Sequence, residues 1–279
     1  MTTIGPVTLT VADLPRALAF YTECLGFRIH AEDGGKAKLG AGADDLLVLV
    51  EREGAQRAPG ATGLFHFAVL LPSREALALA LARLAETRTL LHGAADHLVS
   101  ESLYLADPEG NGIELYRDRP RPTWVWEARA VRMTVDPLDV EALLREAAVS
   151  RIAWGGVPEG TVIGHVHLRV AHIAPAERFY CDLLGFDLTA RYGTQASFVA
   201  SGGYHHHVAF NTWSGVGAPP PPEGATGLRE FVVRLTDADE LERVLARLAG
   251  AGVPEAPDGL IRDPSGNAVR LAARGMTLN

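Results

Sequence analysis

The sequence repeats itself, and this repeat limits the folds that the chain can adopt. The stretch IGPVTLTVADLPRALAFYTECLGF begins at Ile4, and a similar stretch, IGHVHLRVAHIAPAERFYCDLLGF, begins at Ile163. GATGLFHFAVLL at Gly60 and GATGLREFVVRL at Gly224 form a second pair, and DPEGNGIEL and DPSGNAVRL close the two halves. Because the same three landmarks occur in the same order, we expect each half to contain the same structural units.

Each half divides again into two modules. In each module a short apolar strand is followed by a helix with apolar residues at spacings of three and four, and then by further strands. The Asp-Pro-x-Gly-Asn sequence is a turn before the last strand of each half. The predicted strands include 7–11, 45–50, 166–170 and 205–211, and the predicted helices include 73–85 and 238–248. The pattern therefore predicts four βαβββ modules that start near Ile4, Gly63, Ile163 and Gly227.

Residues 118–160 join the two halves. They contain Trp124 and Trp126, which we expect to pack this linker against a domain. A helix is predicted over 137–148, with Asp136 as its N-cap. We therefore divide the chain into a first domain of two modules (1–117), a linker with a helix (118–160) and a second domain of two modules (161–279).

Composition and charge exclude several classes of protein. The formal net charge is −8, which argues against nucleic acid as a partner because phosphate binding needs a basic surface. No apolar run approaches the roughly 20 residues that span a bilayer, and we expect neither a membrane segment nor a signal peptide. The two cysteines do not have a metal-ligand spacing. A cytoplasmic protein is expected, and the sequence leaves open whether it forms a homo-oligomer.

The FYxxxLGF and DPxGN motifs of both halves resemble those of the vicinal oxygen chelate superfamily, which includes glyoxalases, bleomycin-resistance proteins and extradiol dioxygenases. The resemblance covers nearly the whole chain outside 118–160. It implies an α+β fold in which four βαβββ modules form two curved-sheet domains. In this superfamily a pair of modules wraps a curved sheet around a metal, and the ligands come from first and last strands. The motifs specify the fold and leave the reaction open.

The first and last strands then name the candidate ligands. The first-strand positions of modules one to four are Pro6, His66, His165 and Glu230, and the last-strand positions of modules two and four are Glu114 and Arg270. Pairing modules two and three brings together His66, Glu114 and His165, a facial triad typical of non-haem Fe(II) enzymes. Pairing within halves leaves one site a ligand short and puts the cation of Arg270 into the other. We therefore predict crossed pairing around Fe(II), or Mn(II), with Arg270 meeting Glu230 or an acidic neighbour. His167, on the same strand face as His165, remains an alternative ligand.

Two further residues are candidates for catalysis through the same resemblance. Residues 203–213 read GYHHHVAFNTW, and extradiol dioxygenases have a His-His-x-apolar-Ala-Phe strand whose second histidine is an acid–base. This register implies His206, with His205 and His207 on the other face of the strand. Tyr104 lies ten residues before Glu114, a spacing at which these enzymes have a tyrosine that hydrogen-bonds the substrate.

The resemblance to the catechol 2,3-dioxygenase branch implies an extradiol ring-cleaving dioxygenase of aromatic catabolism. Its substrates would be a catechol, with ring substituents that the sequence does not name, and O2. The product would be a muconic semialdehyde. Two alternatives stay open: a glyoxalase-type metal-dependent isomerase or lyase, and a small-molecule-binding resistance protein without enzyme activity.

Overall fold

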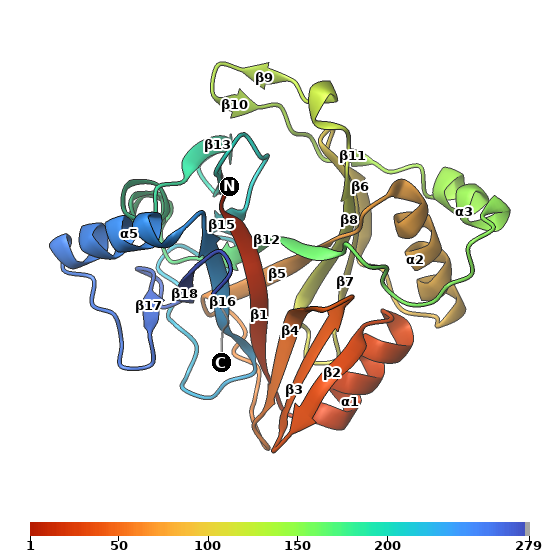
Figure 1. Cartoon of the computed structure of the whole chain (residues 1–279), viewed down its shortest axis with the longest axis horizontal. Coiled ribbons are helices and arrows are strands. Elements are labelled where there is room, and N and C mark those ends of the chain that lie inside the picture. Colours follow the sequence, from red (N-terminus) through yellow and green to blue (C-terminus); the bar gives the residue numbers. More distant parts are fainter. Residues whose placement is uncertain (277–279) are drawn as a thin grey trace.

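The computed structural model describes residues 1–276 and contains two large curved sheets, each built from both halves of the sequence (Figure 1). The nine-stranded sheet contains, in spatial order, β11 (Asp136–Pro137), β6 (Gly93–Asp96), β7 (Ser100–Ala106), β8 (Gly112–Asp118), β5 (Gly63–Leu70), β12 (Val162–Arg169), β15 (Val208–Asn211), β14 (Ala196–Ala200) and β13 (Asp187–Tyr192). The seven-stranded sheet contains β17 (Leu260–Arg262), β18 (Ala268–Ala273), β16 (Gly227–Leu235), β1 (Thr3–Val11), β4 (Asp44–Glu51), β3 (Lys36–Ala41) and β2 (Arg28–Asp33). β9 (Trp126–Glu127) and β10 (Ala130–Val131) form a separate hairpin.

The order of the strands confirms the crossed pairing of modules. β5 from the first half pairs antiparallel with β12 from the second half, and β1 pairs antiparallel with β16. The nine-stranded sheet therefore combines modules two and three, and the seven-stranded sheet combines modules one and four. The predicted boundaries at 117 and 160 mark the repeat in the sequence, whereas each sheet takes strands from both sides of them.

The helices pack beside the sheets. They are α1 (Leu14–Ala19) with its π-helical continuation η1 (Phe20–Cys24), α2 (Arg74–Glu86), η2 (Arg121–Thr123), α3 (Val140–Val149), α4 (Ile173–Glu177) with its π-helical continuation η3 (Arg178–Leu183), and α5 (Ala238–Gly250). Helices α1, α2, α3 and α5 each begin after an aspartate or serine cap. Ser73 accepts a hydrogen bond from the Ala76 amide at the start of α2, and Asp237 does the same for Glu240 at α5. Within the described residues no helix is both long and apolar enough to cross a membrane.

The linker helix differs from its prediction at its start. Helix α3 begins at Val140 and not at Pro137, and its N-cap is Asp139, whose carboxylate accepts the Ala142 amide at 2.8 Å. Asp136 is not the cap because it lies in β11, opposite Asp96 of β6, and accepts a hydrogen bond from Thr134. Two aspartates three residues apart offer two caps, and the pairing of β11 with β6 decides between them.

The strand predicted over 205–211 is shorter than expected. β15 begins at Val208, after a turn in which Gly202 and Gly203 have φ of +65° and +69°. His205 and His206 therefore do not alternate between sheet faces: their rings lie side by side, with the two Nδ1 atoms 2.7 Å apart. The prediction that His205 lies on the opposite face from His206 is wrong, because alternation holds only in regular strands.

The two sequence motifs of each half form one structural unit. The FY tyrosine of the first half, Tyr21, donates a hydrogen bond to Asp107 of the DPEGN turn at 2.8 Å, and Tyr180 donates to Asp263 of the second turn at 3.1 Å. Asp107 also accepts hydrogen bonds from the backbone and side-chain nitrogens of Asn111. The buried phenol therefore fixes the turn that leads into β8, the strand that carries Glu114.

Candidate metal centre

Three ligand-type side chains converge on the nine-stranded sheet. His66 lies on β5, Glu114 on β8 and His165 on β12, and β5 is the strand between the other two. One ligand atom from each of the three lies within 4.8 Å of the others, and all three residues are buried. Ala68 of β5 is opposite both Glu114 and His165. Its small side chain leaves the space into which the three larger side chains point.

The two imidazoles face one carboxylate oxygen. The Nε2 atoms of His66 and His165 each lie 3.0 Å from Oε2 of Glu114. The other carboxylate oxygen, Oε1, accepts a hydrogen bond of 2.6 Å from the hydroxyl of Ser102 on β7. Because Ser102 is fully buried, this hydrogen bond holds the carboxylate plane and leaves Oε2 directed at the imidazoles.

The residues fit a bound metal cation. Nε2 of His66 is buried and makes no hydrogen bond, although it lies 3.0 Å from Oε2 of Glu114. A buried imidazole nitrogen without a partner is costly, and a cation between the three side chains would satisfy it. Two imidazoles and a carboxylate are a ligand set that divalent transition metals prefer.

The protonation states also suit metal binding. Burial raises the pKa of Glu114, but His165 and His66 outweigh this effect and hold it well below its ordinary value. Burial lowers the pKa of His165 to about 4, and the nearby Glu114 carboxylate opposes that shift. At neutral pH the carboxyl is therefore ionised and the His165 imidazole is neutral, as a metal ligand requires.

His167 lies outside this cluster. Its ring centroid is 5.0 Å from that of His66, and its Nε2 lies 2.9 Å from the side-chain nitrogen of Asn211, within hydrogen-bond distance. Burial, and then His66 and His165, lower its pKa well below the ordinary value. His167 therefore lines the site as a neutral ring, and the geometry favours His165 as the third ligand.

His206 lies against the cluster, as expected of a catalytic candidate. Its ring centroid is 4.1 Å from that of His165 and 5.2 Å from that of Phe198. Burial, and then His165 and His205, lower the pKa of His206 well below its ordinary value. The ring is therefore neutral at physiological pH and can accept a proton.

Tyr104 lies on the opposite side of the cluster. It is the partner of Glu114 in the pairing of β7 with β8, and its ring centroid is 5.7 Å from that of His66. Its hydroxyl lies 2.6 Å from Nε2 of His97, whose Nδ1 lies 2.6 Å from the carbonyl oxygen of Thr134. Because a carbonyl oxygen only accepts hydrogen bonds, Nδ1 of a neutral His97 donates one to Thr134. Nε2 of His97 then accepts a hydrogen bond from the Tyr104 hydroxyl. Burial, and then Glu114, raise the pKa of Tyr104 well above its ordinary value, so it remains a phenol.

The second sheet has an ion pair at the equivalent positions. Arg270 donates to both carboxylate oxygens of Glu230, at 2.8 and 3.0 Å, which confirms the predicted partner of Arg270.

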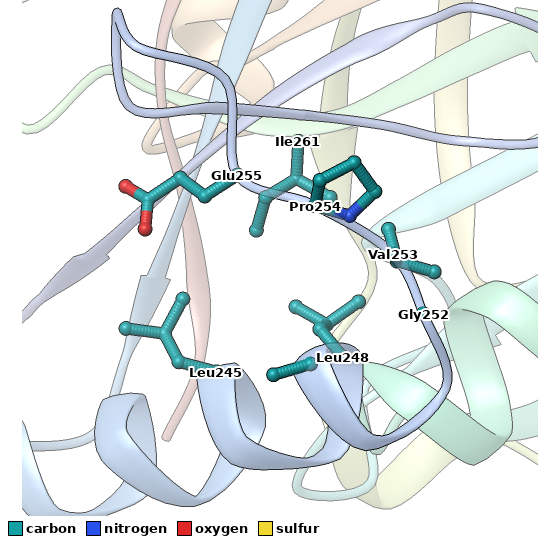
Figure 2. Close-up of a pocket in the computed structure, with 8 residues that line it drawn as sticks. Leu245, Leu248, Gly252, Val253, Pro254, Glu255 and Ile261 are labelled. Carbon is teal, nitrogen blue, oxygen red and sulfur yellow. The ribbon is translucent and has the colours of Figure 1, made fainter.

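A hollow of about 490 Å³ lies between α5 and the loop before β17, and neither Glu230 nor Arg270 lines it (Figure 2). In Figure 2, Leu245 and Leu248 of α5 lie on one side of it and Glu255 and Pro254 on the other, and Glu255 is the one charged residue of its lining. This hollow therefore lacks a set of metal ligands.

Comparisons with known proteins agree with this fold. A family model described as the glyoxalase/bleomycin resistance protein/dioxygenase superfamily matches residues 3–115 and 162–271. A catechol-2,3-dioxygenase from Bacillus subtilis (strain 168) is 45% identical over 256 residues, which are 90% of this chain and 89% of the relative. A solved structure of a protein from Bacillus subtilis subsp. subtilis str. 168 superposes with a TM-score of 0.65 at 14% identity over 98% of this chain and 86% of its own. Glyoxalase I from Zea mays superposes with a TM-score of 0.58 at 16% identity over 98% and 92%. At such low identities the two structures show the fold alone.

Proposed function

This chain belongs to the glyoxalase/bleomycin resistance protein/dioxygenase superfamily, and from that premise we propose that it is a metal-dependent extradiol dioxygenase. The proposed reaction opens a catechol ring beside its two hydroxyl groups and adds both atoms of O2 to the product. The observation that carries the proposal is the buried cluster of His66, Glu114 and His165. The similarity to a catechol-2,3-dioxygenase over 90% of the chain supports the same reaction.

We propose that Fe(II), with Mn(II) as the alternative, is held by His66, Glu114 and His165. A facial set of three ligands leaves open positions for substrate and O2. When bound, the cation would supply Lewis acidity that lowers the pKa of the catechol hydroxyls and would provide electron transfer between ring and O2. Ser102 would keep the carboxylate in place during turnover through its hydrogen bond to Oε1.

The proposed roles of the protein side chains follow from their protonation. His206, a neutral ring next to His165, would take a proton from a catechol hydroxyl. Tyr104 would position the substrate from the other side. The Tyr104 hydroxyl donates its hydrogen bond to His97, so its oxygen can accept a hydrogen bond from the second hydroxyl of the catechol. Phe198, which lies against His206, would exclude water from this side of the ring.

The proposed partners are a small catechol and O2. We also propose that the chain acts in a reducing compartment such as the cytoplasm, because Cys24 and Cys181 are free thiols.

Anaerobic reconstitution tests the proposed reaction. The metal-free protein is loaded with Fe(II) or Mn(II), and catechol is added in air while oxygen uptake and absorbance are recorded. We expect one O2 consumed per catechol and a yellow product, the semialdehyde anion. Metal binding without oxygen uptake from any member of a catechol panel would refute a dioxygenase. Isomerisation of a hemithioacetal by the same preparation would establish the glyoxalase-type alternative instead.

A further inference from the structure

A continuous line of hydrogen bonds runs from the candidate catalytic histidine to the beginning of the linker. Nδ1 of His206 lies 2.7 Å from Nδ1 of His205, and Nε2 of His205 lies 3.0 Å from a carboxylate oxygen of Asp118. None of the three residues belongs to the His66–Glu114–His165 cluster. Asp118 is therefore connected to the candidate metal centre through the hydrogen-bonded rings of His205 and His206.

The chemistry of the end group determines the direction of each hydrogen bond. A carboxylate only accepts hydrogen bonds, so Nε2 of His205 must carry a hydrogen and donate a hydrogen bond to Asp118. In a neutral His205 the other nitrogen, Nδ1, then has a lone pair and accepts. Its partner, Nδ1 of His206, must be the donor. A neutral His206 with its proton on Nδ1 has its lone pair on Nε2.

We propose that Asp118 and His205 are positioning residues that fix the tautomer of His206, so that Nε2 is the nitrogen able to accept a proton from substrate. This inference rests on the proposed role of His206 as general base. A ring free to adopt either tautomer would spend part of its time with Nε2 protonated, a form that cannot take a proton at that atom.

The surroundings hold both positioning residues in place. Asp118 ends β8, on the same strand face as Glu114 and Tyr116, because residues two apart point the same way. The hydroxyl of Tyr204 donates a hydrogen bond of 3.2 Å to the same Asp118 oxygen that accepts from His205. Two donors therefore hold the Asp118 carboxylate in place. One strand thus supplies both the proposed metal carboxylate and the carboxylate that orients the base.

His205 is fixed through its backbone and its ring. The hydroxyl of Thr189 donates to the His205 carbonyl oxygen at 2.6 Å. The ring of Trp124, a buried linker residue, packs on the His205 ring with centroids 5.2 Å apart. His205 is fully buried, so water does not compete for its hydrogen bonds. The packing expected of Trp124 is confirmed, whereas Trp126 is more than a third exposed.

Nitrogen-15 NMR of the imidazole side chains tests the proposal without turnover. The full-length protein is loaded with Zn²⁺, which is diamagnetic and accepts the same ligands, and spectra are recorded near pH 8. In the wild type we expect a protonated Nδ1 and an unprotonated Nε2 for His206. Asp118→Ala removes the acceptor, and we expect the two His206 shifts to move toward each other as the tautomers mix. Asp118→Asn retains an acceptor oxygen for His205 and Tyr204, and we expect spectra like those of the wild type.

Kinetics with the Fe(II) protein give a second measurement. Asp118→Ala should lower kcat by roughly tenfold to a hundredfold and leave KM within about twofold. The loss is smaller than the full effect of a general base, because His206 itself is still present. Its metal content should equal that of the wild type, which separates positioning from a general loss of structure. A wild-type His206 protonated on Nε2, an Asp118→Ala protein with unchanged shifts, or an Asp118→Asn protein that behaves like Asp118→Ala would each overturn the proposal. Absence of ring cleavage in the wild type would instead refute the proposed function, because the NMR measurement does not depend on it.

Discussion

Removing the hydroxyl of Ser102 should weaken metal binding without touching a ligand. The hydroxyl donates a 2.6 Å hydrogen bond to Oε1 of Glu114, and both groups are buried. A hydrogen bond to a charged group contributes about 1.5–3 kcal/mol. Each 1.4 kcal/mol is tenfold in an equilibrium constant, so Ser102→Ala should raise the metal Kd by about tenfold to a hundredfold.

The assay is a titration of metal-free protein with Mn(II), in which the concentration of free Mn(II) is measured from its electron paramagnetic resonance signal. Ser197→Ala is a matched control, because the Ser197 hydroxyl donates a similar 2.7 Å hydrogen bond to Glu177, a carboxylate that is not one of the three clustered residues. Ser197 is likewise fully buried, so both variants remove one serine–glutamate hydrogen bond beside the nine-stranded sheet.

The two variants together decide the question. Ser197→Ala should leave the Kd within about twofold of the wild type, since Glu177 is not among the proposed ligands. If Ser102→Ala also left the Kd within about twofold, the orientation of Glu114 would not depend on Ser102. Equal weakening in both variants would indicate a general loss of stability and would refute the reasoning in the same way.

Three further predictions concern the ligands, the titrating groups and the substrate contact. Glu114→Ala should abolish stoichiometric metal binding with the fold kept, whereas Arg270→Ala should leave metal content unchanged; elemental analysis and circular dichroism check both. The metal-free protein should lose stability as pH falls. The pKa of His165 is about 4 in the folded protein and 6.5 ordinarily, so protons bind the unfolded chain first. The free energy of unfolding should therefore be highest above pH 6.5 and about 3 kcal/mol lower at pH 4 from this residue alone. A urea midpoint that does not fall between pH 7.5 and pH 4.5 would contradict this. Tyr104→Phe should lower kcat/KM by about threefold to tenfold at unchanged metal content, the cost of one neutral hydrogen bond, and an unaltered kcat/KM would exclude substrate contact.

The repeat explains why the sequence predicts so much of the site. Aligning the modules placed His66, His165 and Glu230 at equivalent positions, and the contrast of Glu114 with Arg270 was enough to predict which modules share a sheet. These inferences succeed because homologous positions in a repeated unit have the same place in the fold, which is a property of the chain alone.

The conformation of the histidine run was not predictable in this way. Alternation along a strand assumes regular backbone, and the two glycines before His205 allow a turn that regular alternation cannot describe. The position of Asp118 could have been inferred, since it follows Glu114 by four residues on one strand and so shares its face. Nothing in the sequence pairs it with His205, because the contact joins residues 87 apart.

The exchange of strands between the halves also bears on how the protein is made. His66 and Glu114 are synthesised well before β12, the strand that brings His165 beside them, and β1 must wait for β16, which starts at Gly227. Contacts between such distant segments are slow to form, since a long loop must close before either sheet is complete. A nascent chain that has left the ribosome only as far as the linker would therefore expose the unpaired edges of β1 and β5. Cell-free synthesis of progressively longer chains should show protease resistance arising late, once most of the polypeptide has emerged.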